Sequence, residues 1–222
     1  MAEGGSSDAT VAVDKPAGPR SRRGARTRER LLDAAKQIFE EDGFLDARIS
    51  DIAQRAEVAH GSFYYYFESK EEIFREVAAA VDDQLSAPLG HIILASSKVP
   101  AGERIREAIS RHFESYRAEA RLMGVIEEVS RHDEQVNAMR MERHRRYAEQ
   151  IAESIRRLQQ HGLADPELDP VVAAAALGAL TYRFAEIWLV EGAVDCSFDD
   201  AVDQVARMFE NALQLRNRDA VA

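Results

Sequence analysis

The sequence predicts an all-α protein in which a small N-terminal domain of three helices precedes a larger helical domain. The first observation behind this prediction is that apolar residues recur at the spacing i, i+3, i+4, i+7, which places them on one face of a helix. The second is that no stretch convincingly alternates apolar and polar residues with the period of two that is typical of a strand. We therefore expect helices joined by turns and no sheet.

Three short helices make up the predicted N-terminal domain. Gly43 marks the end of the first helix. The apolar stripe of that helix consists of Leu31, Ala34, Ala35, Ile38 and Phe39. A second stripe runs over residues 49–56, and after a break at residues 57–59 a third helix covers residues 60–67, HGSFYYYF. Short helices in this order predict a helix-turn-helix.

Longer helices are predicted for the remainder of the chain. Ser69 followed by Glu72 has the pattern of a capping box, which opens a helix reaching to about residue 89. Asp169 before a proline and Ser197 before an acidic turn are typical of helix N-caps. The further predicted helices cover residues 101–119, 121–132, 133–160, 170–191 and 198–215.

One predicted helix has the length of a membrane span. Residues 171–190, VVAAAALGALTYRFAEIWLV, are apolar enough to cross a bilayer. They contain Arg183 and Glu186, which are each costly in hydrocarbon and lie three residues apart, where they can pair on one helix face. We expect a buried helix of the folded body and no membrane partner.

The charge of the chain is unevenly distributed. The net charge is -10, yet residues 20–36 carry seven basic and two acidic residues, a local charge of +5. Residues 71–222 carry 18 basic and 27 acidic residues, a local charge of -9. A basic front on an acidic body predicts that only the front meets a polyanion. We divide the chain into a flexible basic arm over residues 1–24, a helix-turn-helix domain over residues 25–72 and a helical domain over residues 73–222.

The composition is typical of a cytoplasmic globular protein. Hydrophobic residues make up 45% of the chain and charged residues 31%, which excludes a disordered or membrane-embedded class. A single cysteine, Cys196, excludes an intramolecular disulfide and is compatible with a reducing compartment. The first residues lack the apolar run of a signal peptide.

The third short helix is the candidate recognition element, because in a helix-turn-helix this helix lies in the major groove of DNA. Phe63 and Phe67 are four residues apart and would anchor it to the core. Its predicted exposed residues are small or hydrogen-bonding: His60, Gly61, Ser62, Tyr64 and Tyr65. An aromatic core cluster is the alternative explanation for residues 64–66, but three consecutive helix residues span about 200° of surface, so at least one should be exposed.

Residues 52–74, IAQRAEVAHGSFYYYFESKEEIF, resemble the DNA-binding signature of TetR-type repressors, and residues 31–44, LLDAAKQIFEEDGF, resemble the first helix of that family. The matching positions are Ile52, Ala53, Ala56, Val58, Gly61, Tyr64, Tyr66, Phe67, Ser69, Lys70 and Glu71. This resemblance implies a sequence-specific transcriptional regulator, most often a homodimeric repressor that a small effector releases from its operator.

The resemblance also implies roles for individual residues. Positions matching Tyr64, Tyr66 and Lys70 usually hold phosphates, and those matching His60, Gly61 and Tyr65 face bases. Ser62 would contact phosphate or base. The first helix begins near the DNA backbone at Thr27 and Arg28, and Arg48 and Ser50 complete the predicted DNA-binding set.

The chain departs from the family pattern at three positions next to the recognition helix. Glu57 stands in the turn where the family usually has glycine, and it stores strain if its φ is positive. Ala59 replaces the serine that usually caps the recognition helix, a loss of about 1 kcal/mol. Arg48 replaces a common threonine and either adds a phosphate contact or is simply solvated. Because these three positions lie next to the recognition helix, we expect the changes to alter the geometry with which that helix contacts bases.

Family members typically dimerise through their last two helices, which here correspond to residues 171–190 and 198–215. A helix that is apolar nearly all round needs burial on two sides, and a second copy supplies one of them. A homodimer predicts a pseudo-palindromic operator on double-stranded DNA.

The resemblance also places an effector pocket among the middle helices. Its candidate lining residues are Phe113, Tyr116, Met123, Ile126, Met139, Arg143, Tyr147, Phe184 and Trp188. Apolar walls with few polar groups favour a lipophilic small molecule, although ordinary core packing is the alternative explanation for each residue. The helix after Ser69 connects the pocket to the DNA-binding domain and is the natural lever between them.

Two other classes of protein compete with this hypothesis. An enzyme is disfavoured because no nucleophile-elbow, Walker A, dinucleotide or zinc-protease motif is found, and no cofactor is expected. His112, His132 and His144 have no metal-ligand spacing, so no metal is expected. A DNA binder without sequence preference is disfavoured by the acidic body and the apolar C-terminal region. Activation instead of repression remains open.

Overall fold

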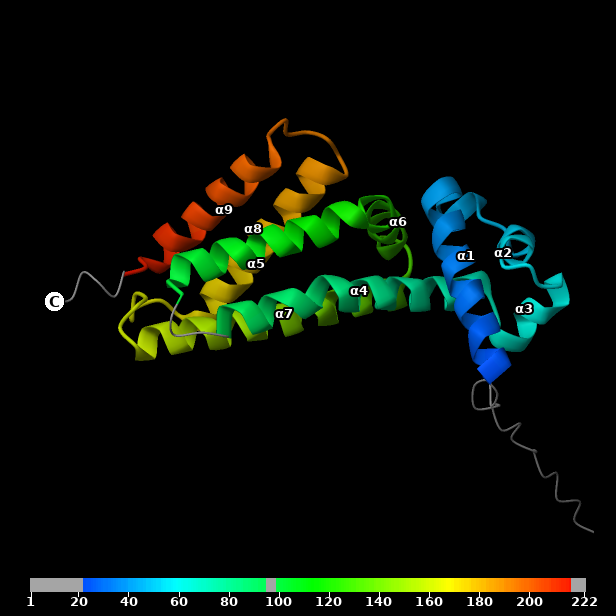
Figure 1. Ribbon diagram of the computed structural model, residues 1–222, viewed down its shortest axis with the longest axis horizontal. Helices are drawn as coiled ribbons and strands as arrows, with labels where there is room; N and C mark the ends of the chain where they lie inside the picture. The colour runs from blue at the N-terminus through cyan, green and yellow to red at the C-terminus, as the bar shows by residue number, and fades with distance from the viewer. Residues whose placement is uncertain (1–21, 95–98, 217–222) are drawn as a thin grey trace, which may run out of the picture.

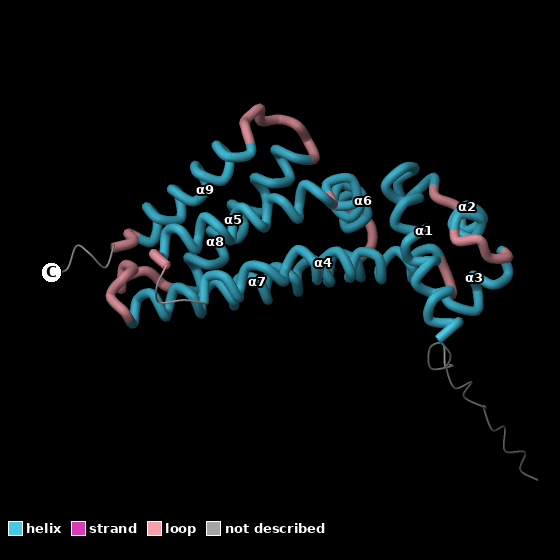
Figure 2. Tube along the Cα trace, viewed as in Figure 1, coloured by secondary structure: helices cyan, strands magenta, loops and turns pink. Residues whose placement is uncertain are grey.

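The computed structural model describes residues 22–94 and 99–216, and this part of the chain is helical without a strand. Figure 2 shows the helices and the loops between them. The helices are α1 (Arg22–Asp46), α2 (Ile49–Arg55), α3 (His60–Tyr66), α4 (Lys70–Leu94), α5 (Ala101–Ala118), α6 (Ala120–Ser130), α7 (Glu134–Gln160), α8 (Pro170–Leu189) and α9 (Phe198–Leu213). The predicted all-α class is confirmed.

The three N-terminal helices gather at one end of an elongated molecule, and α4 runs from them into the larger body (Figure 1). Aromatic side chains form the junction. The ring of Phe74 on α4 meets Phe39 of α1 edge to face, with centroids 5.0 Å apart, and lies 4.8 Å from the ring of Phe44. Phe63 and Phe67 are both buried and hold α3 against this core, as their spacing predicts.

Side-chain caps begin the helices of the body. The carboxylate of Asp133 accepts hydrogen bonds from two backbone N–H groups in the first turn of α7, and Asp169 does the same for α8. The hydroxyl of Ser197 accepts a hydrogen bond from a backbone N–H of α9 at 3.1 Å. Such caps satisfy N–H groups that have no partner inside the helix, each worth about 1 kcal/mol. The predicted starts of these three helices are confirmed.

The start of α1 differs from the prediction. Helix α1 begins at Arg22, so residues 22–24, assigned above to a flexible arm, are helical. Arginine favours the helix nearly as well as leucine does, which carries α1 back into the basic segment. The rest of the predicted arm lies outside the described residues. At its other end α1 is interrupted at Gly43, where φ is 75° and ψ is 177°, as the glycine predicts.

Two connections join the N-terminal helices to the body. Helix α4 is shared by both, and α1 also packs directly against α6. The ammonium of Lys36 on α1 lies 2.7 Å from a carboxylate oxygen of Glu119, the residue between α5 and α6. Helices α4 and α6 are therefore both in direct contact with the N-terminal helices.

Helix α8 is long and apolar enough to span a membrane by length and composition. It packs against α7, α5 and α6, yet only 39% of its most apolar window is buried in the single chain. Arg183 pairs with Glu186 at 2.7 Å, as their spacing predicts. Helix α8 is thus part of the folded body and leaves a face of small apolar residues open.

The turn between α2 and α3 contains a strained residue. Glu57 has a φ of 54°, in the left-handed region where a Cβ atom crowds the backbone. Its carboxylate lies 3.8 Å from Arg30, and both side chains are well exposed, so this ion pair offsets little of the strain. Ala59 caps α3 without a side-chain hydrogen bond.

We predict that Glu57→Gly raises the free energy of unfolding. Relief of the left-handed strain, less the extra freedom of glycine in the unfolded chain, leaves a gain of about 0.5–1 kcal/mol. Urea denaturation measures it. Glu57→Ala removes the carboxylate but keeps the Cβ atom and should give no gain; an equal gain in both variants would mean that charge, and not backbone conformation, limits stability at this turn.

Candidate functional site

The exposed face of α3 carries the residues predicted to meet bases. Tyr65 is 75% exposed and Tyr64 is 53% exposed, while Phe63, the residue just before them, is fully buried. The ring of His60 meets that of Tyr64 edge to face at 5.6 Å, and Tyr65 meets Tyr66 in the same way at 5.0 Å. These contacts give the face a defined aromatic surface.

Gly61 lies on this exposed face at the start of α3. A Cβ atom built at Gly61 would meet nothing within 4 Å, and its φ is not in the left-handed region. The packing of the protein itself therefore does not require a glycine here. A missing side chain at an open position instead lets an external surface approach the helix backbone closely.

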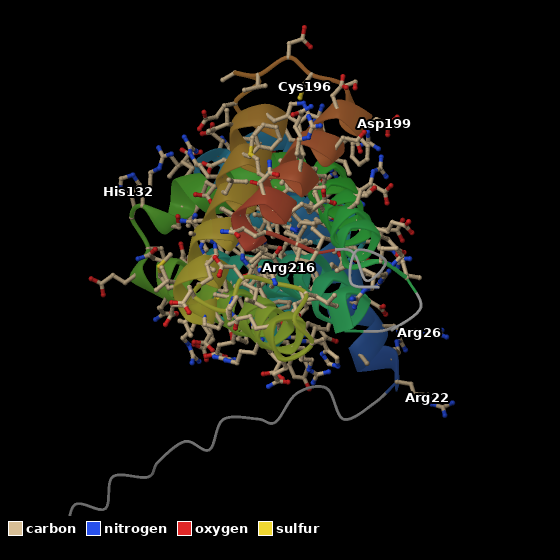
Figure 3. The ribbon with its side chains drawn as sticks, turned by 90° about the vertical axis from the view of Figure 1, so that its left-hand side faces the viewer. Arg22, Arg26, His132, Cys196, Asp199 and Arg216 are labelled. Carbon is tan, nitrogen blue, oxygen red and sulfur yellow. The ribbon has the colours of Figure 1, made fainter. Side chains whose placement is uncertain are left out.

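Other predicted DNA-binding residues flank α3. Arg48 and Ser50 are exposed at the start of α2, where the Ser50 hydroxyl donates to the carboxylate of Asp51 at 3.1 Å. Ser62 and Tyr66 are half-buried, on the border of the exposed face. The first turn of α1 presents exposed basic side chains, of which Figure 3 shows Arg22 and Arg26 projecting from the body.

Arg28 and Thr27 each make a contact within the protein. The guanidinium of Arg28 pairs with the carboxylate of Glu76 on α4 and lies 4.9 Å from the centre of the Phe67 ring. The hydroxyl of Thr27 donates to the backbone carbonyl of Arg23 at 3.1 Å. Arg28 thus ties α1 to α4, because the carboxylate and ring there attract it inward, and a phosphate would have to compete with Glu76.

Lys70 also has a partner that the sequence pattern does not show. Its ammonium donates to the backbone carbonyls of Phe44, Leu45 and Ala47 at 2.6, 3.1 and 2.9 Å, and lies 4.7 Å from the centre of the Phe44 ring. An ammonium has three donor hydrogens, so these carbonyls use its whole capacity. In this structure Lys70 holds the end of α1 to the start of α4, and is not free to address a phosphate.

A cavity of about 450 Å³ opens between α7 and α8, with Leu85 of α4 and His112 of α5 in its wall. Helix α8 contributes small residues, including Ala175, Gly178 and Ala179. Because these side chains are short, α8 leaves room beside the longer side chains of α7. The volume lies within the range typical of small-molecule sites.

The residues predicted to line an effector pocket are only partly in this cavity. Arg143 and Tyr147 line it, as predicted. The structure places the other predicted residues away from its wall: Phe113, Tyr116, Met123, Ile126, Met139, Phe184 and Trp188. Most of them fill the core instead; the Phe113 and Trp188 rings meet at 5.6 Å, and Phe184 and Trp188 stack at 5.9 Å. Large apolar side chains gain most from full burial, so the core takes them and the cavity does not.

Sequence reasoning missed six polar residues of the cavity wall: His112, His144, Arg145, Glu149, Arg156 and Tyr182. The sequence did carry one signal for such a residue: His112 lies on a helix stripe that is otherwise apolar. Burial, together with the nearby charge of Arg143, lowers the pKa of His112 to about 4. Burial likewise lowers the pKa of His144 to about 4. Both imidazoles are neutral at physiological pH.

A buried ion pair lies behind this wall. The guanidinium of Arg143 pairs with the carboxylate of Asp82 on α4, and both side chains are buried. Burial raises the pKa of the Asp82 carboxyl, and the Arg143 charge acts in the opposite direction. The Tyr182 hydroxyl donates to Glu127, which also pairs with Arg140. Cavity wall, α4 and α6 are therefore joined by one polar network.

The histidines do not form a metal site in the described part of the chain. His132 is exposed at the edge of the body (Figure 3) and does not line the cavity that His112 and His144 border. No group of three or more metal-ligating side chains is found among the described residues.

The N-terminal helices match a known family. Residues 31–77 match the family model of bacterial regulatory proteins of the tetR family. This range covers most of α1, all of α2 and α3, and the first turns of α4, and so includes the exposed face of α3 and Lys70.

Similarity to regulators extends over most of the chain. The HTH-type transcriptional regulator UidR of Escherichia coli is 28% identical over 173 residues, which cover 78% of this chain and 87% of UidR. The A-factor receptor protein of Streptomyces griseus is 30% identical over 202 residues, covering 86% of this chain and 64% of that protein.

Solved structures share the fold. Salmonella enterica GusR has a TM-score of 0.69 at 22% identity, covering 88% of this chain and 98% of that chain. The fatty acid degradation regulator FadR from Bacillus halodurans has a TM-score of 0.67 at 20% identity, covering 85% and 99%. The relatives are transcriptional regulators and not enzymes. The family match and the relatives together support a TetR-family, DNA-binding transcriptional regulator.

Proposed function

We propose that this protein is a cytoplasmic homodimeric repressor that binds a pseudo-palindromic operator and is released from it by a small, largely apolar effector. The observation that carries the proposal is the pairing of an exposed aromatic recognition face on α3 with a cavity whose wall is ion-paired to α4. The names of the relatives support the same kind of protein: one is a receptor for A-factor and others are regulators of fatty acid metabolism.

DNA contact is proposed for the exposed residues of α3 and the surfaces beside it. His60, Gly61 and Tyr65 would face bases, since they project from a helix that two buried phenylalanines hold in place. Tyr64 and Arg48 would contact phosphates. The local charge of +5 over residues 20–36 favours DNA at this end, while the acidic body disfavours a general nucleic-acid coat.

Dimerisation is proposed through α8 and α9. Val171 and Val172 on α8 are 56% and 68% exposed, and Met208 on α9 is 49% exposed. Apolar side chains in this number on adjacent helices are typical of a surface that a partner covers. A second copy burying α8 gives the helix the second packed face that its composition demands, and no membrane is needed to explain its apolarity.

Helix α4 is proposed as the lever between effector and DNA. Asp82 lies twelve residues beyond Lys70, which is roughly 18 Å along the helix. One end of α4 therefore holds the carbonyls of α1, and the other pairs with Arg143 in the cavity wall. A ligand that binds better when α7 is displaced would shift α4, and with it the spacing of the two recognition helices.

Selection of preferred sites from a random pool of double-stranded DNA, at physiological salt, tests the proposed function. We expect a pseudo-palindrome whose half-sites lie one helical turn apart, roughly 34 Å. A pool recovered without any preferred sequence would contradict specific regulation and favour a DNA binder without sequence preference.

Lys70→Met separates a structural role from a phosphate contact. It removes the ammonium but keeps the stem, so the free energy of unfolding should fall by about 2 kcal/mol as three carbonyls lose a charged donor. Arg48→Met is the matched control at an exposed position: it should leave unfolding unchanged, weaken binding to all DNA sequences and reduce the slope against salt by about one. An unchanged urea midpoint for Lys70→Met would show that its ammonium does not hold α1.

A double-mutant cycle on Asp82 and Arg143 tests the link between α4 and the cavity. Asp82→Asn leaves a buried guanidinium without its counter-charge and should cost about 3 kcal/mol in urea denaturation. Adding Arg143→Met removes the second charge and should recover most of this loss. Simply additive losses would mean that the two residues do not act as a pair. Glu149→Gln, at the exposed mouth of the cavity, is the control and should leave stability nearly unchanged.

A further inference from the structure

The polar atoms of the cavity wall restrict the chemistry of its ligand. We infer that the cavity takes an uncharged molecule with a long apolar part, whose polar end accepts a hydrogen bond from Arg143 and exchanges hydrogen bonds with His112. This inference rests on the proposed effector site and specifies which class of molecule that site selects.

Every guanidinium of the cavity wall already has a carboxylate. Arg143 pairs with Asp82 behind the wall. At the mouth, Arg145 pairs with Glu142 at 2.7 Å and with Glu149 at 3.0 Å. The third, Arg156, lies 3.5 Å from the carboxylate of Glu153, which it shares with Arg157 at 3.1 Å, and its side chain is exposed to solvent. The buried part of the wall therefore offers no unmatched positive charge.

The imidazoles of the wall add no charge. Burial is the largest cause of the lowered pKa of both His112 and His144, and each would gain a proton only in acid. An anion that entered the cavity would lose its hydration without meeting an unpaired cation, and it would approach the carboxylates of Glu149 in the wall and of Asp82 behind it. A cation would find both carboxylates already paired. A neutral molecule carries neither penalty.

Hydrogen-bonding capacity, in contrast, is left unused. The Nη2 atom of Arg143 is buried without a hydrogen-bond partner, as are both ring nitrogens of His112. The His112 residue is 5% exposed and Arg143 is 4% exposed, and both residues border the cavity. Buried donors and acceptors are normally satisfied. A neutral imidazole has one donor and one acceptor, and Arg143 adds a donor, so the missing group has an acceptor and a donor side by side.

The rest of the cavity suits an apolar chain or ring system. Leu85, Ala148 and Ala152 lie on one side, and Ala175, Gly178 and Ala179 lie on the other. A Cβ atom at Gly178 would come within 3.3 Å of the Tyr147 ring, so the glycine lets α8 pack closely against Tyr147 of α7. An uncharged amide or hydroxyketone head with an apolar body matches these walls.

Binding of decanamide, decanoate and decylammonium, measured by calorimetry at pH 7.5 on the full chain, tests the inference. The three probes share one apolar chain and differ only in the charge and hydrogen bonds of the head. We expect decanamide to bind at least tenfold more tightly than either charged probe. Decanoate or decylammonium binding as tightly as decanamide would overturn the inference, as would the failure of all three to bind.

Two variants test whether residues of the cavity wall cause the preference for decanamide. His112→Phe keeps a ring of similar size without nitrogens, and should reduce the affinity for decanamide about tenfold while leaving decanoate little changed. Ala179→Phe fills the cavity mouth and should abolish the binding of every probe. A preference for decanamide that survives in His112→Phe at full strength would contradict the assigned hydrogen bonds.

Release of the selected operator DNA, followed by fluorescence anisotropy in the same samples, separates this inference from the proposed function. A charged probe that binds and releases the operator would overturn the ligand class and leave the repressor standing. Probes that bind in the predicted order without changing operator affinity would support the ligand class and count against effector control.

Discussion

A buried ion pair between Asp82 and Arg143 connects the two ends of this protein. Neither charge is stable in the interior without the other, so α4 and α7 stay in contact as long as both side chains are charged. The pair places a rigid helix between a cavity wall and the N-terminal helices. In the proposed mechanism a small rearrangement at Arg143 would be transmitted because α4 would shift as a unit, whereas a flexible linker would absorb the same change.

The recognition end is held by packing and not by local backbone preference. Ala59 offers α3 no side-chain cap, and Glu57 occupies a left-handed conformation in the turn before it. What keeps α3 in place is the burial of Phe63 and Phe67. A short helix with weak ends and a strong anchor presents Tyr65 firmly on its outer face, and its termini are where the backbone most readily adjusts to a bound surface.

The fold was predictable from local signals, because caps and breaks such as Asp133 and Gly43 act within a few residues of themselves. The exposed face of α3 followed from periodicity in the same way. The residues that line the cavity could not be predicted in this way, because large apolar residues such as Phe113 are equally suited to a core. Only the packing of α5, α7 and α8 decides which of them border empty space. The partners of Lys70 lie more than twenty residues away in the chain, so no local pattern reveals them.

The ammonium of Lys70 sets where this chain can be divided. It belongs to α4 by sequence but completes the end of α1, so residues 22–69 are not a separable unit. The family model accordingly continues past Lys70 to residue 77. A chimeric regulator that exchanges its DNA-reading half at the turn before α4 would leave three carbonyls of α1 facing a foreign helix. The junction for such an exchange lies inside α4, beyond the aromatic contact of Phe74, where both halves keep their own partners.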